Sequence, residues 1–217
     1  MFNDTYISND TYVSENPLAV LKPEKEPRRY TLAEFLRREE QSEELHEYYD
    51  GLIIKLPMAR SPHNIIGSNM ITALNMAFMA MDKNYLVSGL QQMVYLPKLN
   101  FGLYPDVIVI TEKPKFWDNN EVLLINPIVI IEFLSKSTKK YDRKEKFAEY
   151  KTLASFQEYI LIEQNKCHVE MRFREEPNLW RDTIYTEMSD SIYLKSLDCA
   201  IPLKLIYRNI QFPQPKK

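Results

Sequence analysis

The sequence contains few cysteines, only Cys167 and Cys199 among its 217 residues. They form no CxxC motif and have no metal-ligand spacing, which argues against a zinc site built on cysteine pairs. Two isolated cysteines do not make the disulfide framework of a small secreted domain either. We therefore expect reduced thiols, as in a cytoplasmic protein.

The chain also lacks the segments that direct a protein to a membrane or across it. No apolar run approaches the roughly 18 residues that a membrane-spanning helix needs. The start, MFNDTYISND, has neither the basic residues nor the apolar stretch of a secretory signal. We therefore expect a cytoplasmic protein without a membrane partner.

An excess of positive charge is absent as well. The formal net charge is -2, which is not the profile of a strongly basic nucleic-acid binder, although a local basic patch stays possible. Hydrophobic residues make up 45% of the chain, enough for one domain with a substantial core. Tandem NDTYIS and NDTYVS repeats and several prolines predict a flexible N-terminal tail over residues 1–28. The domain is expected over residues 29–210, with a C-terminal tail over 211–217.

Local patterns predict a mixture of helices and strands. A capping box from Thr31 to Glu34 predicts a helix start, and Asp50-Gly51 predicts the turn of a hairpin within LHEYYDGLIIKL. Ser61 as N-cap followed by Pro62 predicts the start of a second helix. Further elements are expected as strands in YLVSGLQQMVYL, YPDVIVI and PIVIIEFL, a helix over about 143–154, a hairpin in EYILIEQNKCHVEMRFR and a strand near 180–186. This order predicts a mixed α/β sheet rather than a regular βαβ repeat.

Two acids lie in runs that otherwise read as buried strands. Asp106 opens PDVIVI, and Glu132 lies near the end of PIVIIEFL. They can be neighbours only if the two strands are antiparallel, because one acid begins its strand and the other nearly ends its own. A pair of carboxylates suits Mg²⁺, which prefers oxygen ligands. The alternative is that Asp106 follows a turn and Glu132 pairs with an arginine.

The helix predicted after these acids offers a positive partner. On a wheel of about 100° per residue, Lys146 falls within the apolar, sheet-facing sector, whereas Lys144 lies nearer solvent. Asp142 is expected to cap this helix together with Glu145. A lysine beside two carboxylates can orient a water or offset charge that develops on a phosphate. The other reading is a lysine that snorkels from the edge of the core.

Other polar residues could contact a nucleic acid. His63, in the first turn of its helix, can contact a phosphate or cap the helix, although isolated histidines are usually structural or exposed. A basic cluster near the acids could hold a nucleic-acid backbone, or it could be a solvated charged face. This cluster consists of Lys136, Lys139, Lys140, Arg143 and Lys144.

An ordered set of motifs links these residues to a known family. It consists of HEYYDG, SPHNIIG, the PD of Pro105-Asp106, EFLSKST from Glu132, YDRKEKFAEY and EYILI. The set resembles a restriction-endonuclease-like family that is abundant in photosynthetic bacteria and belongs to the PD-(D/E)xK nuclease superfamily. The resemblance implies a restriction-endonuclease-like α/β (mixed α+β) core, with a mixed, mostly antiparallel sheet flanked by helices. It also implies that Asp106 and Glu132 bind Mg²⁺, or Mn²⁺ in its place.

One position departs from the superfamily pattern. The superfamily lysine lies two residues after the glutamate, where this chain has Leu134. The superfamily can move the lysine to a neighbouring helix, which makes Lys146 the candidate. Lys136 has the same strand parity but lies about 13 Å along an extended chain, so it is weaker. Glu47, three residues before Asp50, matches an acidic position of the family and is either a third acid of the site or an exposed strand residue.

The resemblance thus implies a metal-dependent endonuclease-like hydrolase that cuts phosphodiester bonds, with DNA as the expected substrate. A homodimer is one assembly that would place two sites on a duplex. The lysine missing at position 134 keeps a second class open, a catalytically inactive nuclease-fold protein that binds nucleic acid or a protein partner. A cleft that holds Asp106, Glu132 and Lys146 together would favour the nuclease.

Overall fold

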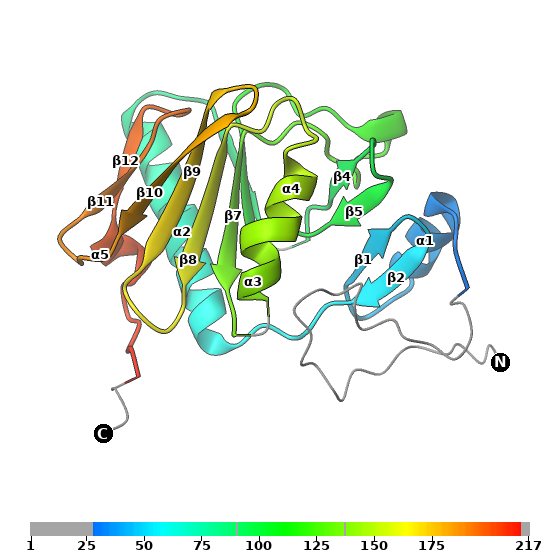
Figure 1. Cartoon of the computed structure of the whole chain (residues 1–217), viewed down its shortest axis with the longest axis horizontal. Helices are drawn as coiled ribbons and strands as arrows, with labels where there is room; N and C mark the ends of the chain where they lie inside the picture. The colour runs from blue at the N-terminus through cyan, green and yellow to red at the C-terminus, as the bar shows by residue number, and fades with distance from the viewer. Residues whose placement is uncertain (1–27, 90, 137, 214–217) are drawn as a thin grey trace.

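The computed structural model describes residues 28–89, 91–136 and 138–213, which form three sheets and their flanking helices (Figure 1). The predicted N-terminal tail lies outside the described residues except for Arg28, and the predicted C-terminal tail is described only at 211–213. Within these ranges no helix has both the length and the apolar character needed to cross a membrane.

The larger sheet is mixed, with six strands in the order β10-β9-β8-β7-β6-β3. Strands β7 and β8 are parallel, and every other neighbouring pair is antiparallel. The expected mixed, mostly antiparallel sheet is therefore confirmed. Its strands are β3 (Leu86–Gly89), β6 (Val107–Ile110), β7 (Val129–Leu134), β8 (Glu158–Glu163), β9 (Val169–Glu176) and β10 (Leu179–Tyr185).

A second sheet has four antiparallel strands in the order β2-β1-β5-β4. The predicted hairpin turn is confirmed, because Asp50 and Gly51 have φ values of 45° and 97°. The run YLVSGLQQMVYL is divided between the sheets, since the chain leaves the larger sheet after β3 and enters the smaller one at β4. The strands are β1 (His46–Tyr49), β2 (Leu52–Lys55), β4 (Val94–Leu96) and β5 (Phe101–Leu103), and a separate hairpin joins β11 (Ser191–Leu194) to β12 (Cys199–Pro202).

Two helices begin close to the predicted residues. Helix α1 (Leu32–Glu39) carries the expected capping box, with the Thr31 hydroxyl accepting from the Glu34 amide at 3.2 Å. In helix α2 (Ser61–Ala80) the N-cap is Arg60, so the prediction of Ser61 as N-cap is wrong by one residue. Proline lacks the amide hydrogen that the first turn leaves unpaired, so it fits the second helical position as well as the first.

The third helical run differs from its prediction. It consists of α3 (Lys139–Tyr141), a π-helical turn η3 (Asp142–Lys146) and α4 (Phe147–Tyr150). The predicted range 143–154 is therefore wrong at both ends, and Asp142 is buried inside the run rather than capping it. The physical reason is that the chain becomes helical directly after the strand–helix turn. There the hydroxyls of Ser135 and Thr138 lie 3.0 Å apart.

Two apolar layers cover the larger sheet. Helix α2, the short helix α5 (Leu203–Ile206) and the β11–β12 hairpin lie on one face, and α3, η3 and α4 lie on the other with the smaller sheet. Figure 1 shows α2 behind the larger sheet and α4 in front of it. Along β7, Ile131 and Phe133 belong to the first layer, and Ile130 and Leu134 to the second. Because side chains alternate along a strand, Glu132 faces the layer that contains α4.

The backbone of Gly89 lies very close to the backbone of Asp106. It pairs with Val107 between β3 and β6. A Cβ atom on Gly89 would lie 2.7 Å from the carbonyl oxygen of Asp106. That oxygen belongs to the backbone, so it cannot swing away as the end of a side chain can.

We predict that Gly89→Ala lowers the free energy of unfolding by about 1–3 kcal/mol, the usual cost of overpacking. Denaturant titration of the purified variant measures this loss. Ser88→Ala, at the preceding position of β3, adds no atom and is the matched control with a much smaller expected effect. Equal unfolding midpoints for Gly89→Ala and the wild type would show that the contact is not tight.

Candidate active site

The antiparallel pairing of β6 and β7 brings the two predicted acids together. Val107 lies opposite Ile131 and Ile108 opposite Ile130, so the residue before β6 reaches the end of β7. There the Oδ2 atom of Asp106 accepts a hydrogen bond from the Phe133 amide at 2.6 Å. The predicted antiparallel arrangement is confirmed, and Asp106 is anchored directly beside Glu132.

Lys146 joins the two sheets at this point. Its Nζ atom lies 3.0 Å from Oε1 of Glu132 on β7 and 3.3 Å from Oε1 of Glu47 on β1. All three residues are buried, with exposed fractions of 6% for Lys146, 4% for Glu132 and 4% for Glu47. The predicted sheet-facing orientation of Lys146 is confirmed, and Lys144 is exposed as expected. A single ammonium group thus lies between carboxylates from two different sheets.

Glu132 is oriented by its neighbours through one oxygen. Its Oε1 atom accepts from the Tyr150 hydroxyl at 2.9 Å and also faces Lys146. Among the described residues, none donates a hydrogen bond to Oε2. The carboxylate is therefore held through Oε1, and no donor among the described residues occupies the lone pairs of Oε2.

Glu47 is a buried member of this cluster, so the alternative that it is an exposed strand residue is wrong. Its Oε1 atom accepts from the Tyr104 amide at 3.2 Å, and its Oε2 atom accepts from the Tyr49 hydroxyl at 2.6 Å. The burial follows from the second sheet, whose strand β1 packs its Tyr49 against the layer that contains α4.

Asp106 has a second partner that sequence reasoning gave little weight. The Nε2 atom of His63 lies 3.1 Å from Oδ1 of Asp106, and the His63 ring packs edge-on against Phe133. Burial lowers the pKa of His63, but the hydrogen bond and charge of Asp106 outweigh it and raise the pKa overall. The available signal was the place of His63 in the first turn of a helix, which did not identify its partner.

The charges of the cluster do not balance. Burial raises the pKa of Glu132 well above its ordinary range, Lys146 opposes this, and Asp106 and Asp142 add to it. Burial also raises the pKa of Asp142 to about 6. Burial alone would lower the pKa of Lys146, but Glu132 and Glu47 raise it well above its ordinary value. Three buried acids thus share one buried lysine, which is an environment that favours a further cation or a proton.

The oxygen ligands available here fit a magnesium ion. No group of three or more His, Cys, Asp or Glu side chains forms a cation site within the described residues. Mg²⁺ does not need one, because it is commonly held by one or two carboxylates together with water and phosphate oxygens. Asp106 and Glu132 supply such carboxylates at the end of one strand pair.

The predicted basic cluster divides into two kinds of residue. Arg143 donates to Oε1 of Glu163 at 2.9 Å and to both oxygens of Glu170 at 2.6–3.0 Å. These bonds connect the helical run to β8 and β9, so the guanidinium group of Arg143 has a structural role. The remaining cluster residues are exposed near the start of the run, namely Lys136, Lys139, Lys140 and Lys144.

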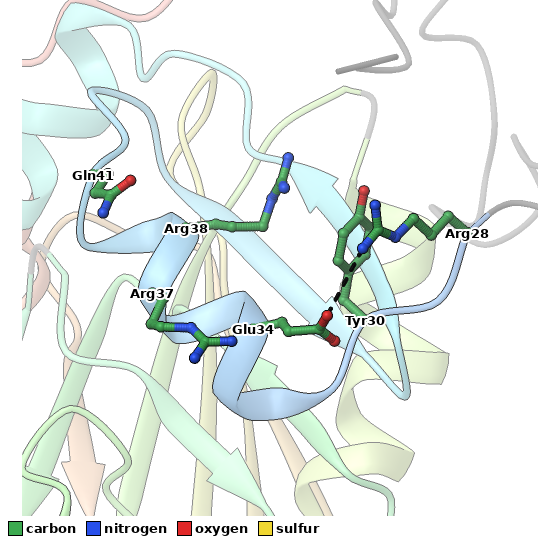
Figure 2. A pocket seen from close by; sticks show the side chains of 6 residues that line it. All are labelled: Arg28, Tyr30, Glu34, Arg37, Arg38 and Gln41. Carbon is green, nitrogen blue, oxygen red and sulfur yellow. Dashed lines mark ion pairs between the residues drawn. The ribbon is translucent and has the colours of Figure 1, made fainter. Parts of the chain in front are cut away.

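A hollow of about 270 Å³ lies over helix α1, apart from the buried acids and Lys146 (Figure 2). The Tyr30 ring contacts two guanidinium groups there, Arg28 at 4.7 Å and Arg38 at 4.8 Å from the ring centroid. Figure 2 also shows the ion pair of Arg28 with Glu34. None of the predicted catalytic residues lines this hollow, so the candidate site is defined by its buried charges and not by a large cavity.

Comparisons with known proteins show which family and which relatives this chain is similar to. A family model described as "Putative restriction endonuclease", the Uma2 family, matches residues 32–203. "Uncharacterized protein sll1609" of Synechocystis sp. is 37% identical over 140 residues, which cover 64% of this chain and 78% of that protein. "Uncharacterized protein slr1290" of the same organism is 28% identical over 179 residues, covering 82% and 92%.

A solved structure shares the fold. The crystal structure of "a putative nuclease belonging to DUF820" from Anabaena variabilis matches with a TM-score of 0.63 at 20% sequence identity. The match covers 82% of this chain and 97% of that one. The expected restriction-endonuclease-like resemblance is therefore confirmed at the level of family and fold, and because the family model spans most of the chain, this protein belongs to the Uma2 family.

Proposed function

We propose that the protein is a metal-dependent nuclease that hydrolyses phosphodiester bonds in DNA. The observation that carries this proposal is the buried Lys146 ammonium, 3.0 Å from Glu132, which in turn lies beside Asp106. Two carboxylates and a lysine at one point are the groups that metal-assisted phosphodiester hydrolysis needs. Membership of the family described as "Putative restriction endonuclease" supports the same class of reaction.

In this proposal Asp106 and Glu132 hold Mg²⁺, and Mn²⁺ can replace it. A bound cation of this kind polarises the scissile phosphate and lowers the pKa of a water molecule. Glu47 is the third acid of the site. It stabilises the Lys146 ammonium, since its Oε1 atom faces the Nζ atom of Lys146.

The protein's own groups have separate tasks. Lys146 is held as an ammonium between two carboxylates, and its remaining hydrogens can orient the attacking water or contact a phosphate oxygen. Tyr150 fixes the Glu132 carboxylate through its hydroxyl. His63 and the Phe133 amide fix Asp106 from two directions. These contacts keep the acids in place before substrate arrives, so little reorganisation is needed during the reaction.

The exposed lysines near the start of the helical run are the proposed contacts to the DNA backbone. Lysines in such positions neutralise phosphates and make binding dependent on salt concentration. Arg143 is left out of this surface because Glu163 and Glu170 engage its guanidinium. A homodimer would let two sites act on a duplex, and a cytoplasmic location would suit the free thiols of Cys167 and Cys199.

We predict that Asp106→Ala weakens Mn²⁺ binding by at least about tenfold, because even outer-shell partners of a metal ligand contribute about 10- to 100-fold. Isothermal titration calorimetry of the purified protein measures this affinity. Glu176→Ala, an exposed acid on β9, should bind Mn²⁺ like the wild type. Equal binding by Asp106→Ala and the wild type would rule out the proposed ligand.

We also predict that Lys146→Ala lowers DNA cleavage by about 10²-fold or more, the effect of losing one well-placed electrostatic or proton-transfer group. Metal binding should persist in this variant, because the carboxylates that hold the ion remain. Lys146→Met keeps most of the side-chain volume and tests the charge alone if the alanine variant is unstable. Cleavage of plasmid DNA with Mg²⁺, with Mn²⁺ and with chelator provides the measurement.

Lys144→Ala is the matched control on the solvent side of the same turn. It should weaken DNA binding and flatten its salt dependence while largely sparing the cleavage step. The catalytic assignment fails if Lys144→Ala abolishes cleavage and Lys146→Ala does not. DNA binding by the wild type without cleavage under any metal condition would instead favour the binding-only function that Leu134 keeps open.

A further inference from the structure

A chain of hydrogen bonds leads out of the candidate active site through two tyrosines. The Tyr49 hydroxyl lies 2.6 Å from Oε2 of Glu47 and 2.9 Å from the Tyr141 hydroxyl. The Tyr141 hydroxyl lies 2.8 Å from Oε2 of Glu149. This series of hydrogen bonds thus starts on β1 in the smaller sheet, crosses to α3 and ends on α4, where Glu149 is half-buried.

The number of hydrogens in this series of hydrogen bonds indicates whether a carboxyl group is protonated. Three hydrogen bonds need three hydrogens, but each tyrosine hydroxyl supplies only one, and an ionised carboxylate only accepts. If both glutamates were ionised, each tyrosine would donate to its own carboxylate. The two hydroxyl oxygens would then face each other at 2.9 Å without a hydrogen between them. A proton on one of the two carboxyl groups completes all three bonds.

Glu149 is the end that holds this proton. The Oε1 atom of Glu47 faces the Lys146 ammonium at 3.3 Å and accepts from the Tyr104 amide, so this carboxyl group already has a cation and a donor beside it. At Glu149, burial is the main cause that raises the pKa, to about 7; Tyr141 and Lys146 oppose this shift, and the charges of Glu47 and Glu145 add to it. Glu145 also has a buried Oε2 atom without a hydrogen-bond partner in the described structure, so no donor offsets its charge there.

We propose that Glu149, Tyr141 and Tyr49 form a proton relay between Glu47 in the candidate active site and the half-buried end of the chain on α4. When a proton arrives at Glu47, Glu149 releases its own proton to solvent and the two hydroxyls rotate, so that Tyr49 donates to Tyr141 and Tyr141 donates to Glu149. The proton of Glu47 then passes to Tyr49 as the hydrogen of Tyr49 moves to Tyr141 and that of Tyr141 moves to Glu149, which regains a proton. Each O–H bond that breaks is matched by one that forms, so the relay needs no other reactant.

The use of this relay rests on the proposed nuclease function. During hydrolysis the attacking water bonds to phosphorus, the bond to the leaving oxygen breaks, and the water loses one proton. Lys146 can accept that proton as it gives one of its own to Glu47, which lies 3.3 Å away. The relay then carries the charge away from the site, and Lys146 remains an ammonium.

Infrared difference spectroscopy tests the shared proton without any need for cleavage. The full chain, titrated through about pH 7 near the pKa of Glu149, should lose a carboxylic-acid C=O band of Glu149 as the pH rises. Glu149→Gln should remove this band, and Glu145→Gln should keep it. If no titrating band depends on Glu149, the relay is disproved, whether or not the protein cuts DNA.

The pH dependence of cleavage tests the use of the relay. Tyr141→Phe and Glu149→Gln should lower kcat about tenfold, less than the about 10²-fold expected for a group that transfers the proton directly, and should remove the pH dependence near neutrality. Glu149→Asp should restore part of the pH dependence. Tyr48→Phe is the matched control, because Tyr48 is also buried on β1 but donates to the Tyr30 carbonyl. A wild-type pH profile in Tyr141→Phe, with its band retained, would show that the proton is structural only.

Discussion

The ion pairs of Lys146 with Glu132 and Glu47 are the interactions on which the arrangement of the site depends. Each carboxylate would be costly to bury alone, and each belongs to a different sheet. The lysine therefore compensates two desolvated charges and also fixes where the smaller sheet sits against the larger one. Removing it would leave two acids facing each other across an interface, so these ion pairs contribute to the packing of the two sheets as well as to the charge of the site.

The hydroxyl groups around the cluster have a complementary effect. Tyr150 and Tyr49 hold the two carboxylates that face Lys146, and both belong to the apolar layer between α4 and the sheets. Their rings supply buried area and their hydroxyls supply hydrogen bonds, which is why tyrosine suits the edge of such a site. The polar groups are thus oriented by residues that also build the core.

Much of the site follows from sequence patterns because it is set by local periodicity. The strand runs position Asp106 and Glu132, and the helical spacing of apolar residues places Lys146 toward the sheet. The helix boundaries do not follow, because the helical run begins at Lys139, directly after the strand–helix turn, and contains a π-helical turn at Asp142–Lys146 that the apolar spacing does not reveal. Nor do the burial of Glu47, the pairing of His63 with Asp106 or the tyrosine chain. These contacts join residues far apart in sequence, and single residues carry no signal of such partners.

The position of Lys146 on a helix, and not on the strand of Glu132, has a consequence for how relatives of this protein can be found. When the lysine follows the glutamate on one strand, its position is fixed by a constant spacing. Here the amine reaches Glu132 from a helix, so its place depends on its phase with the apolar residues of that helix. The connection before the helix can gain or lose residues without changing this phase. A search for a fixed interval between the two residues would therefore overlook such chains. A search for a lysine in phase with the apolar residues of the following helix would recover them, whatever the length of the intervening turn.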